Sequence, residues 1–128
     1  MMNNNNMNGI SRHKVGRYGE QLVYEALDGA KWSNGGFKTS KQYDIEWDGI
    51  KIDVNSSSIR KSTGFVFSNA SGYKKELVNV FVGMDGKDTF FWVKVNLENK
   101  GFYGRIVEAI DKEKLPSEIK KLAKGGEK

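Results

Sequence analysis

The sequence at residues 42–55 is QYDIEWDGIKIDVN, in which polar and apolar side chains alternate on both sides of Asp48-Gly49. Alternation with a period of two residues is typical of half-buried strands. An Asp-Gly pair is favoured in the two-residue turn of a tight hairpin. We therefore expect two antiparallel strands that meet at Asp48-Gly49 and bury one face.

Counting outward from this turn gives the expected cross-strand pairs. Glu46 faces Lys51, and two residues further from the turn Asp44 faces Asp53. A slip of one residue would destroy the second pairing, because it moves every side chain to the opposite face. In the expected register the apolar face of the hairpin consists of Tyr43, Ile45, Trp47, Ile50, Ile52 and Val54.

The remaining pattern predicts a helix, several strands and a second helix. Apolar residues at helical spacing lie between Ser11, which can cap a helix, and Gly29, which can end one. Pro116 stands where helices often begin. Further strands are expected at 65–67, 77–82 and 89–97, a strand or short helix at 102–110, and a helix at 117–124.

This order of elements predicts one α/β domain with a central mixed sheet flanked by helices. The domain is expected to span residues 11–124, after an asparagine-rich leader at 1–10 and before a loose tail at 125–128. No apolar run approaches the ~20 residues that cross a bilayer, and the leader lacks the apolar core of a signal peptide. We expect a cytoplasmic protein with no membrane segment.

The composition limits the available chemistry. The 128 residues include no cysteine and one histidine, which excludes disulfides, thiol catalysis, Cys-ligated zinc and a His-rich metal site. A metal ion would have to be held by oxygen, which points to Mg²⁺, Mn²⁺ or Ca²⁺. A net charge of +5 mildly favours a polyanionic partner. The alternative is a basic surface that binds no polyanion.

The expected pairing of Asp44 with Asp53 is the informative feature. Like charges directly opposite each other destabilise a sheet, so the two carboxylates must splay into water, share a proton or bind a cation. The alternative to a metal site is a solvent-facing hairpin with hydrated aspartates. Two features favour the metal: Glu20 on the helix edge offers a third oxygen ligand, and Lys51, Arg60 and Lys61 place cations nearby.

These residues resemble the PD-(D/E)XK nuclease superfamily, most closely its Holliday-junction-resolvase-like and small restriction-endonuclease-like members. The resemblance rests on Gly16–Glu20 in the first helix, Tyr43-Asp44-Ile45, and Ile52–Ser57, and it covers roughly residues 12–97. It implies a restriction-endonuclease-like αβββαβ core and Mg²⁺-dependent hydrolysis of DNA, with Mn²⁺ as a substitute. By position, it makes Glu20, Asp44 and Asp53 the acidic catalytic and metal-binding residues.

The sequence departs from this family at Asn55, which stands where the motif has lysine. Three interpretations remain open. The cation has migrated, with Lys51 as the best candidate and Arg60, Lys61 or Lys38 as others. Alternatively, Asn55 positions the attacking water by hydrogen bonds. In the third interpretation the site is inactive and the domain only binds DNA.

The DNA substrate class would include branched or junction DNA, and relatives of this size imply a homodimer. Residues expected to contact phosphates are Arg12, Lys14, Arg17, Lys38, Lys41, Ser57, Arg60 and Lys61. Asn79, in the middle of an apolar strand, is expected to be hydrogen-bonded structure rather than part of a site. The rival functions are a DNA-binding module without catalysis and an assembly protein in which the acidic pair is incidental.

Overall fold

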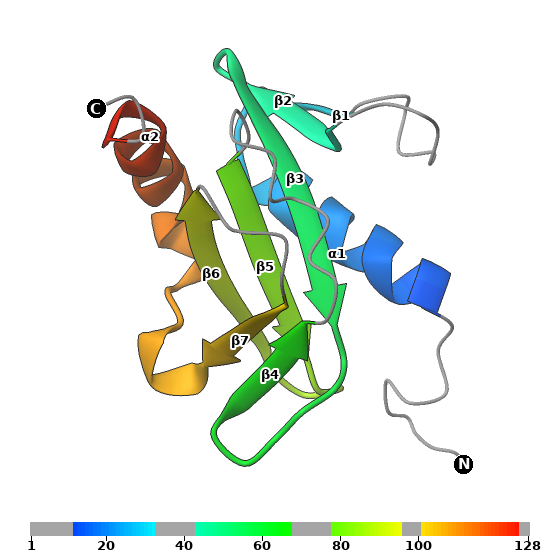
Figure 1. Cartoon of the computed structure of the whole chain (residues 1–128). Helices are drawn as coiled ribbons and strands as arrows, with labels where there is room; N and C mark the ends of the chain where they lie inside the picture. Colours follow the sequence, from blue (N-terminus) through cyan, green and yellow to red (C-terminus); the bar gives the residue numbers. More distant parts are fainter. Residues whose placement is uncertain (1–11, 33–42, 68–77, 96–100, 126–128) are drawn as a thin grey trace.

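The structure is a computed structural model that describes residues 12–32, 43–67, 78–95 and 101–125. It confirms the α/β class: a five-stranded mixed sheet has the order β1-β2-β3-β5-β6, and β4 and β7 form a separate two-stranded ribbon (Figure 1). The elements are α1 (Arg12–Ala26), β1 (Lys31–Trp32), β2 (Ile45–Trp47), β3 (Ile50–Ser57), β4 (Gly64–Phe67), β5 (Val78–Met84), β6 (Thr89–Val95), β7 (Phe102–Arg105) and α2 (Leu115–Gly125).

The hairpin of β2 and β3 forms at the expected turn. Trp47 pairs with Ile50, Glu46 with Lys51, and Ile45 with Ile52. Asp48 has φ 53° and Gly49 has φ 79°, and two positive φ values are what a type I′ turn requires. The turn chemistry therefore fixed the register of the first three pairs.

The sheet is mixed because β3 lies parallel to β5, whereas β5 and β6 are antiparallel. In the parallel ladder Asp53 is the partner of Asn79, and Asn55 is the partner of Phe81. On the next strand, Lys94 is the partner of Asn79. Paired residues in neighbouring strands project from the same face of the sheet, so these pairs form rows across it.

The two faces of the sheet carry separate apolar cores. On one, here the helix face, Val23 of α1 and Ile119 of α2 join Ile52 and Val80 in a single buried cluster. The other, here the ribbon face, packs Phe81 and Trp92 against aromatic residues of the ribbon. Figure 1 shows α1 behind the sheet and the ribbon in front of it. Both described helices therefore cover one face, instead of flanking the sheet as expected.

Helix α1 approaches β3 closely because it has glycine at the contact. A Cβ atom at Gly19 would collide with the Ser56 hydroxyl, whereas one at Gly16 would meet nothing within 4 Å. Beyond the helix, the Trp47 indole donates a hydrogen bond to the Asp28 carbonyl at 2.9 Å. These two contacts fix α1 along the hairpin.

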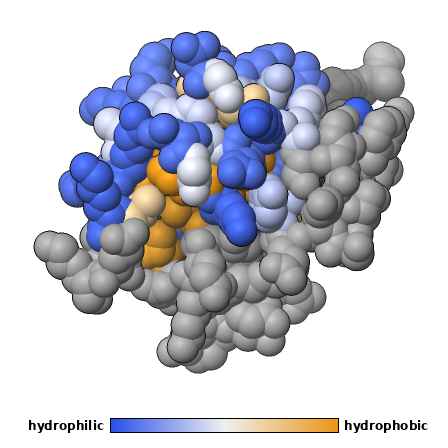
Figure 2. Space-filling model, turned by 90° about the horizontal axis from the view of Figure 1, so that it is seen from above, coloured by the Kyte–Doolittle hydropathy of each residue, from blue (hydrophilic) through white to orange (hydrophobic). Residues whose placement is uncertain are grey.

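The ambiguous segment 102–110 begins as strand β7 and continues as a 3₁₀ turn, η3 (Ile106–Glu108). A second 3₁₀ turn, η4 (Lys112–Lys114), leads into α2, which begins at Leu115, one residue before Pro116. Seen from the hairpin end, the described surface is mostly hydrophilic around a limited hydrophobic area (Figure 2). Among the described helices, neither combines the length and apolar character needed to cross a membrane.

Candidate functional site

Asp44 stands in a bend just before β2 and is bound to β3 at two points. Its backbone N–H donates to the Ile52 carbonyl at 3.0 Å, and its Oδ2 accepts the Val54 N–H at 2.8 Å. Val54 N is bonded to the carbonyl carbon of Asp53, so the Asp44 carboxylate lies within a few ångströms of the Asp53 backbone. The structure therefore places the Asp44 carboxylate next to the backbone of Asp53.

The way in which they meet differs from the expected cross-strand pair. The β2–β3 ladder ends at Ile45–Ile52, and Asp44 also directs its N–H to Ile52. Asp44 and Ile45 thus share Ile52 as their partner, as in a β-bulge. The alternation of side chains between the two faces of the hairpin breaks at Asp44. The expected ladder pair of Asp44 and Asp53 is therefore wrong, because the Asp44 side chain takes the Val54 N–H that a paired strand would have used.

The same break moves Tyr43 away from its expected apolar face. The Tyr43 hydroxyl lies 3.3 Å from Glu46 Oε1, and the Lys51 ammonium lies 5.5 Å from the centre of the Tyr43 ring. Tyr43 therefore shares the polar face with Glu46 and Lys51. Lys51, the expected replacement for the motif lysine, is exposed and lies over this aromatic ring.

Asp53 and Asn55 project from the ribbon face, two residues apart on β3. Asp53 is 9% exposed, and its row across the sheet continues through Asn79 and Lys94. The Asn55 row continues through Phe81 and Trp92, which belong to the aromatic core under the ribbon. The Nδ2 of Asn55 is buried without a hydrogen-bond partner among the described residues. It can therefore donate to a bound water or an oxygen ligand, as the interpretation of Asn55 as a water-positioning residue requires.

Asn79 is a buried polar residue whose surroundings differ from those expected from the sequence. Its side chain is fully buried at 0% exposure, and neither Oδ1 nor Nδ2 has a partner in the described part of the chain. The expectation that Asn79 is hydrogen-bonded structure is therefore wrong. Burying an amide without partners costs about 1–3 kcal/mol, so such a group needs an explanation such as a bound water or ion.

Glu20 comes from α1, which lies on the helix face, whereas Asp53 projects from the ribbon face. Glu20 is buried at 5% exposure, and its Oε1 accepts the Trp32 indole N–H at 3.0 Å. Trp32 also stacks on Tyr24 at 5.0 Å between ring centres and lies 5.8 Å from the Arg17 guanidinium carbon. Arg17, an expected phosphate contact, therefore lies by the same Trp32 side chain that binds Glu20.

The described residues contain no group of three His, Cys, Asp or Glu side chains close enough to hold a metal ion. The expected trio of Glu20, Asp44 and Asp53 is thus not assembled as a cluster of carboxylates. The two aspartates remain a pair of oxygen donors, of the kind that Mg²⁺ and Mn²⁺ prefer. Their chemistry fits a divalent cation, provided that further oxygen atoms complete its coordination.

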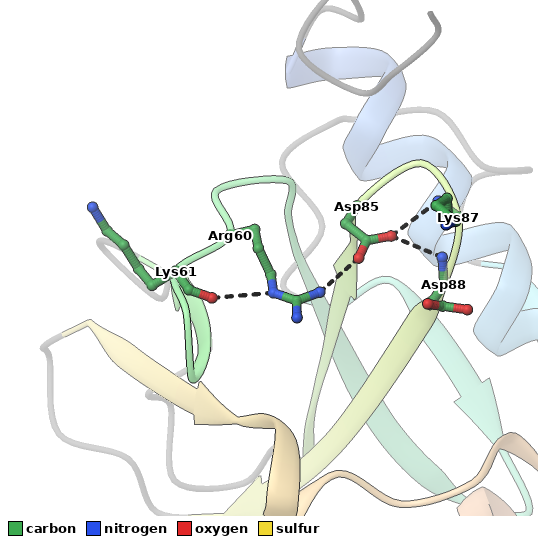
Figure 3. Close-up of polar contacts among 5 residues, drawn as sticks. All are labelled: Arg60, Lys61, Asp85, Lys87 and Asp88. Carbon is green, nitrogen blue, oxygen red and sulfur yellow. Dashed lines mark hydrogen bonds and ion pairs between the residues drawn. The ribbon is translucent and has the colours of Figure 1, made fainter.

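Arg60, another expected phosphate contact, is bound within the protein (Figure 3). Its Nη1 lies 2.6 Å from Asp85 Oδ2, and its Nε donates to the Lys61 carbonyl at 3.1 Å. The guanidinium carbon also lies 5.5 Å from the centre of the Phe65 ring. Arg60 therefore links the segment after β3 to the β5–β6 turn, a structural role that the sequence did not predict.

Asp85 organises that turn. Its Oδ1 accepts the N–H groups of Lys87 and Asp88 at 2.9 and 2.8 Å. Burial alone would raise the pKa of Asp85, but these N–H groups and the Arg60 guanidinium together lower it below its usual 3.8. Asp85 is therefore held in its charged form.

Ser57 does not have a free hydroxyl for phosphate. The residue is buried, and its Oγ donates to the Val66 carbonyl at 2.6 Å and accepts the Ile59 N–H at 3.0 Å. These bonds attach the end of β3 to β4, so the expected phosphate contact is replaced by a structural one.

The other expected phosphate contacts are distributed as follows. Lys61 is exposed after β3. Arg12 and Lys14 belong to the first turn of α1. Lys38 and Lys41 lie outside the described residues. Lys94, which the sequence interpretation did not select, is exposed at the end of the row that begins with Asp53. No local signal marked Lys94, because its place in that row depends on the β3–β5–β6 pairing.

Comparison with known proteins adds no family assignment. No family model, curated protein or solved structure matches the chain.

Proposed function

We propose that this protein is a metal-dependent endonuclease that hydrolyses DNA phosphodiester bonds, with a restriction-endonuclease-like core. One observation carries the proposal: the Asp44 carboxylate is held on the Val54 N–H, directly beside Asp53. This bond supports the proposal because it lies where the β2–β3 ladder has ended, at Ile45–Ile52. The resemblance to PD-(D/E)XK nucleases supports the same assignment of the two aspartates.

In this proposal Asp44 and Asp53 hold Mg²⁺, or Mn²⁺ in its place. The ion, when bound, supplies charge stabilisation for the phosphate and lowers the pKa of a bound water. The buried Nδ2 of Asn55 orients the attacking water, since it projects from the same face as Asp53 and has a hydrogen to donate. Glu20 is buried against Trp32 and acts at most through an intervening water.

The partner in this proposal is DNA, with branched or junction DNA among the substrates, and the working form is a homodimer. Three of the exposed lysines, Lys51, Lys61 and Lys94, contact phosphates in this proposal. The net charge of +5 supports attraction to a polyanion, and this attraction should weaken as the salt concentration rises.

A second function is favoured by one specific observation. Lys51, which would replace the missing motif lysine, lies over the Tyr43 ring and is the ladder partner of Glu46. If no cation reaches the scissile phosphate, the same fold binds DNA without cutting it. A DNA-binding module of this kind would shift DNA in a salt-dependent manner and leave it intact.

The test is a nicking assay on supercoiled plasmid, a four-way junction and single-stranded DNA, with Mg²⁺ or Mn²⁺. The proposal predicts cleavage by the natural sequence and its loss in Asp53→Asn, while Asp111→Asn, which removes an exposed carboxylate elsewhere, cuts normally. Cleavage only after Asn55→Lys would identify the binding module instead. Neither binding nor cutting by either protein would contradict both functions.

A further inference from the structure

Asn79 lies where a ligand of the Asp53 site would be expected. It is the ladder partner of Asp53 in the parallel pair of β3 and β5, so both side chains project from the ribbon face. Side chains paired in this way have Cβ atoms about 5 Å apart. A carboxylate oxygen and an amide oxygen at this spacing can both reach one divalent cation at ~2.0–2.4 Å.

The surroundings of Asn79 separate it from an ordinary core residue. Both of its amide atoms are buried and have no hydrogen-bond partner among the described residues. Its neighbours along β5 are Val78 and Val80, both apolar and buried in the helix-face core. A leucine at position 79 would bring no polar atoms to this buried position, so it would remove the unsatisfied groups.

A bound cation explains the buried, unpartnered amide of Asn79 better than an isolated water does. Asp53 is 9% exposed and lies in the same row, so an acidic side chain already stands beside Asn79 in a mostly buried place. Amide oxygens of asparagine are common ligands of hard divalent cations. The trio of acids expected from sequence is not assembled, which leaves a ligand position for another oxygen.

We propose that Asn79 Oδ1 is a ligand of the divalent cation held by Asp53. This inference rests on the proposed function for the presence of the cation, and it adds a residue that the sequence resemblance does not include. In this arrangement the neutral amide takes the place of a third carboxylate. The bound ion therefore keeps more positive charge toward a phosphate than it would in a three-acid site.

The experiment measures Mn²⁺ binding to the full chain by isothermal titration calorimetry, without DNA, for the natural sequence and two variants. Asn79→Leu should weaken Mn²⁺ binding by about 10- to 100-fold and leave the apo protein at least as stable. Asn79→Asp should tighten Mn²⁺ binding and lower the stability of the apo protein, because a second buried carboxylate is placed beside Asp53. Asp111→Asn is the control for loss of an exposed charge and should bind normally.

The outcomes separate this inference from the proposed function. Unchanged Mn²⁺ affinity in both Asn79 variants, with binding lost in Asp53→Asn, overturns the role of Asn79 and leaves the nuclease proposal standing. Opposite shifts in the two variants, with no DNA cleavage by the natural sequence, support the Asn79 ligand and overturn the nuclease. Absence of Mn²⁺ binding by the natural sequence overturns both.

Discussion

Asp44 accepts the backbone N–H of Val54 at 2.8 Å, and this single bond places its carboxylate beside the backbone of Asp53 on the other strand of the hairpin. It also explains why the ladder stops at Ile45–Ile52, since the carboxylate replaces a backbone acceptor of β2. Asp44 thus combines a structural role with the proposed metal-binding one, and substitutions can separate the two.

Asp44→Asn should keep the hydrogen bond to Val54, because the amide oxygen is still an acceptor, but it removes the negative charge. We expect the free energy of unfolding to change little and Mn²⁺ affinity to fall by about 10- to 100-fold. Asp44→Ala should lose the bond as well and destabilise the fold by about 0.5–1.5 kcal/mol. Urea denaturation and Mn²⁺ titration of both variants make the comparison. Equal Mn²⁺ affinity in Asp44→Asn and the natural sequence would contradict the metal role of Asp44.

Glu20→Gln tests how much Glu20, the buried acidic residue of α1, contributes to Mn²⁺ binding. Its carboxylate accepts the Trp32 indole N–H, and it is not clustered with two other acids in the described residues. We expect Mn²⁺ affinity to change by less than about twofold, far less than the 10- to 100-fold expected at Asp44. Calorimetric titration checks this, and a loss as large as that of Asp44→Asn would place Glu20 among the direct ligands.

Gly19→Ala tests the contact between α1 and β3. The added methyl group would collide with the Ser56 hydroxyl, so we expect a loss of about 1–3 kcal/mol in unfolding free energy. Gly16→Ala is the matched control on the same helix, where nothing lies within 4 Å, and it should stabilise by about 0.5–1 kcal/mol. Thermal denaturation distinguishes the two. Equal shifts of the melting temperature in Gly19→Ala and Gly16→Ala would show that α1 does not pack on Ser56 as described.

The lowered pKa of Asp85 leads to a prediction of how the free energy of unfolding depends on pH. Its pKa is lowered in the folded protein, so the folded state favours the charged carboxylate. The resulting stabilisation is fully present above pH 3.8 and is lost as the pH falls through the lowered folded value. The difference in unfolding free energy between the natural sequence and Asp85→Asn should therefore shrink on acidification. A difference that stays constant between neutral pH and about pH 2 would contradict this account.

The sequence was sufficient for the hairpin because the signals there are local. Alternation and the Asp48-Gly49 turn fix the first three pairs without help from the rest of the chain. The break at Asp44 could not be predicted in the same way, because nothing in its neighbours marks it. It depends on a side chain that competes with the backbone for the Val54 N–H.

The site was harder to predict where it depends on pairing between distant strands. Asn79 became a candidate only when the parallel ladder placed it beside Asp53 and left its amide without partners in the described chain. Arg60 and Ser57 resembled phosphate contacts in sequence, but tertiary contacts engage both with other parts of the protein. Side-chain partners of this kind follow from the fold rather than from local pattern.

Mn²⁺ titration calorimetry of the full chain will show whether Asp44 and Asp53 hold a divalent cation. We predict saturable binding of Mn²⁺ by the natural sequence and its loss in Asp53→Asn, with both proteins folded by circular dichroism. No heat of binding from the natural sequence, or equal binding by Asp53→Asn, would contradict it.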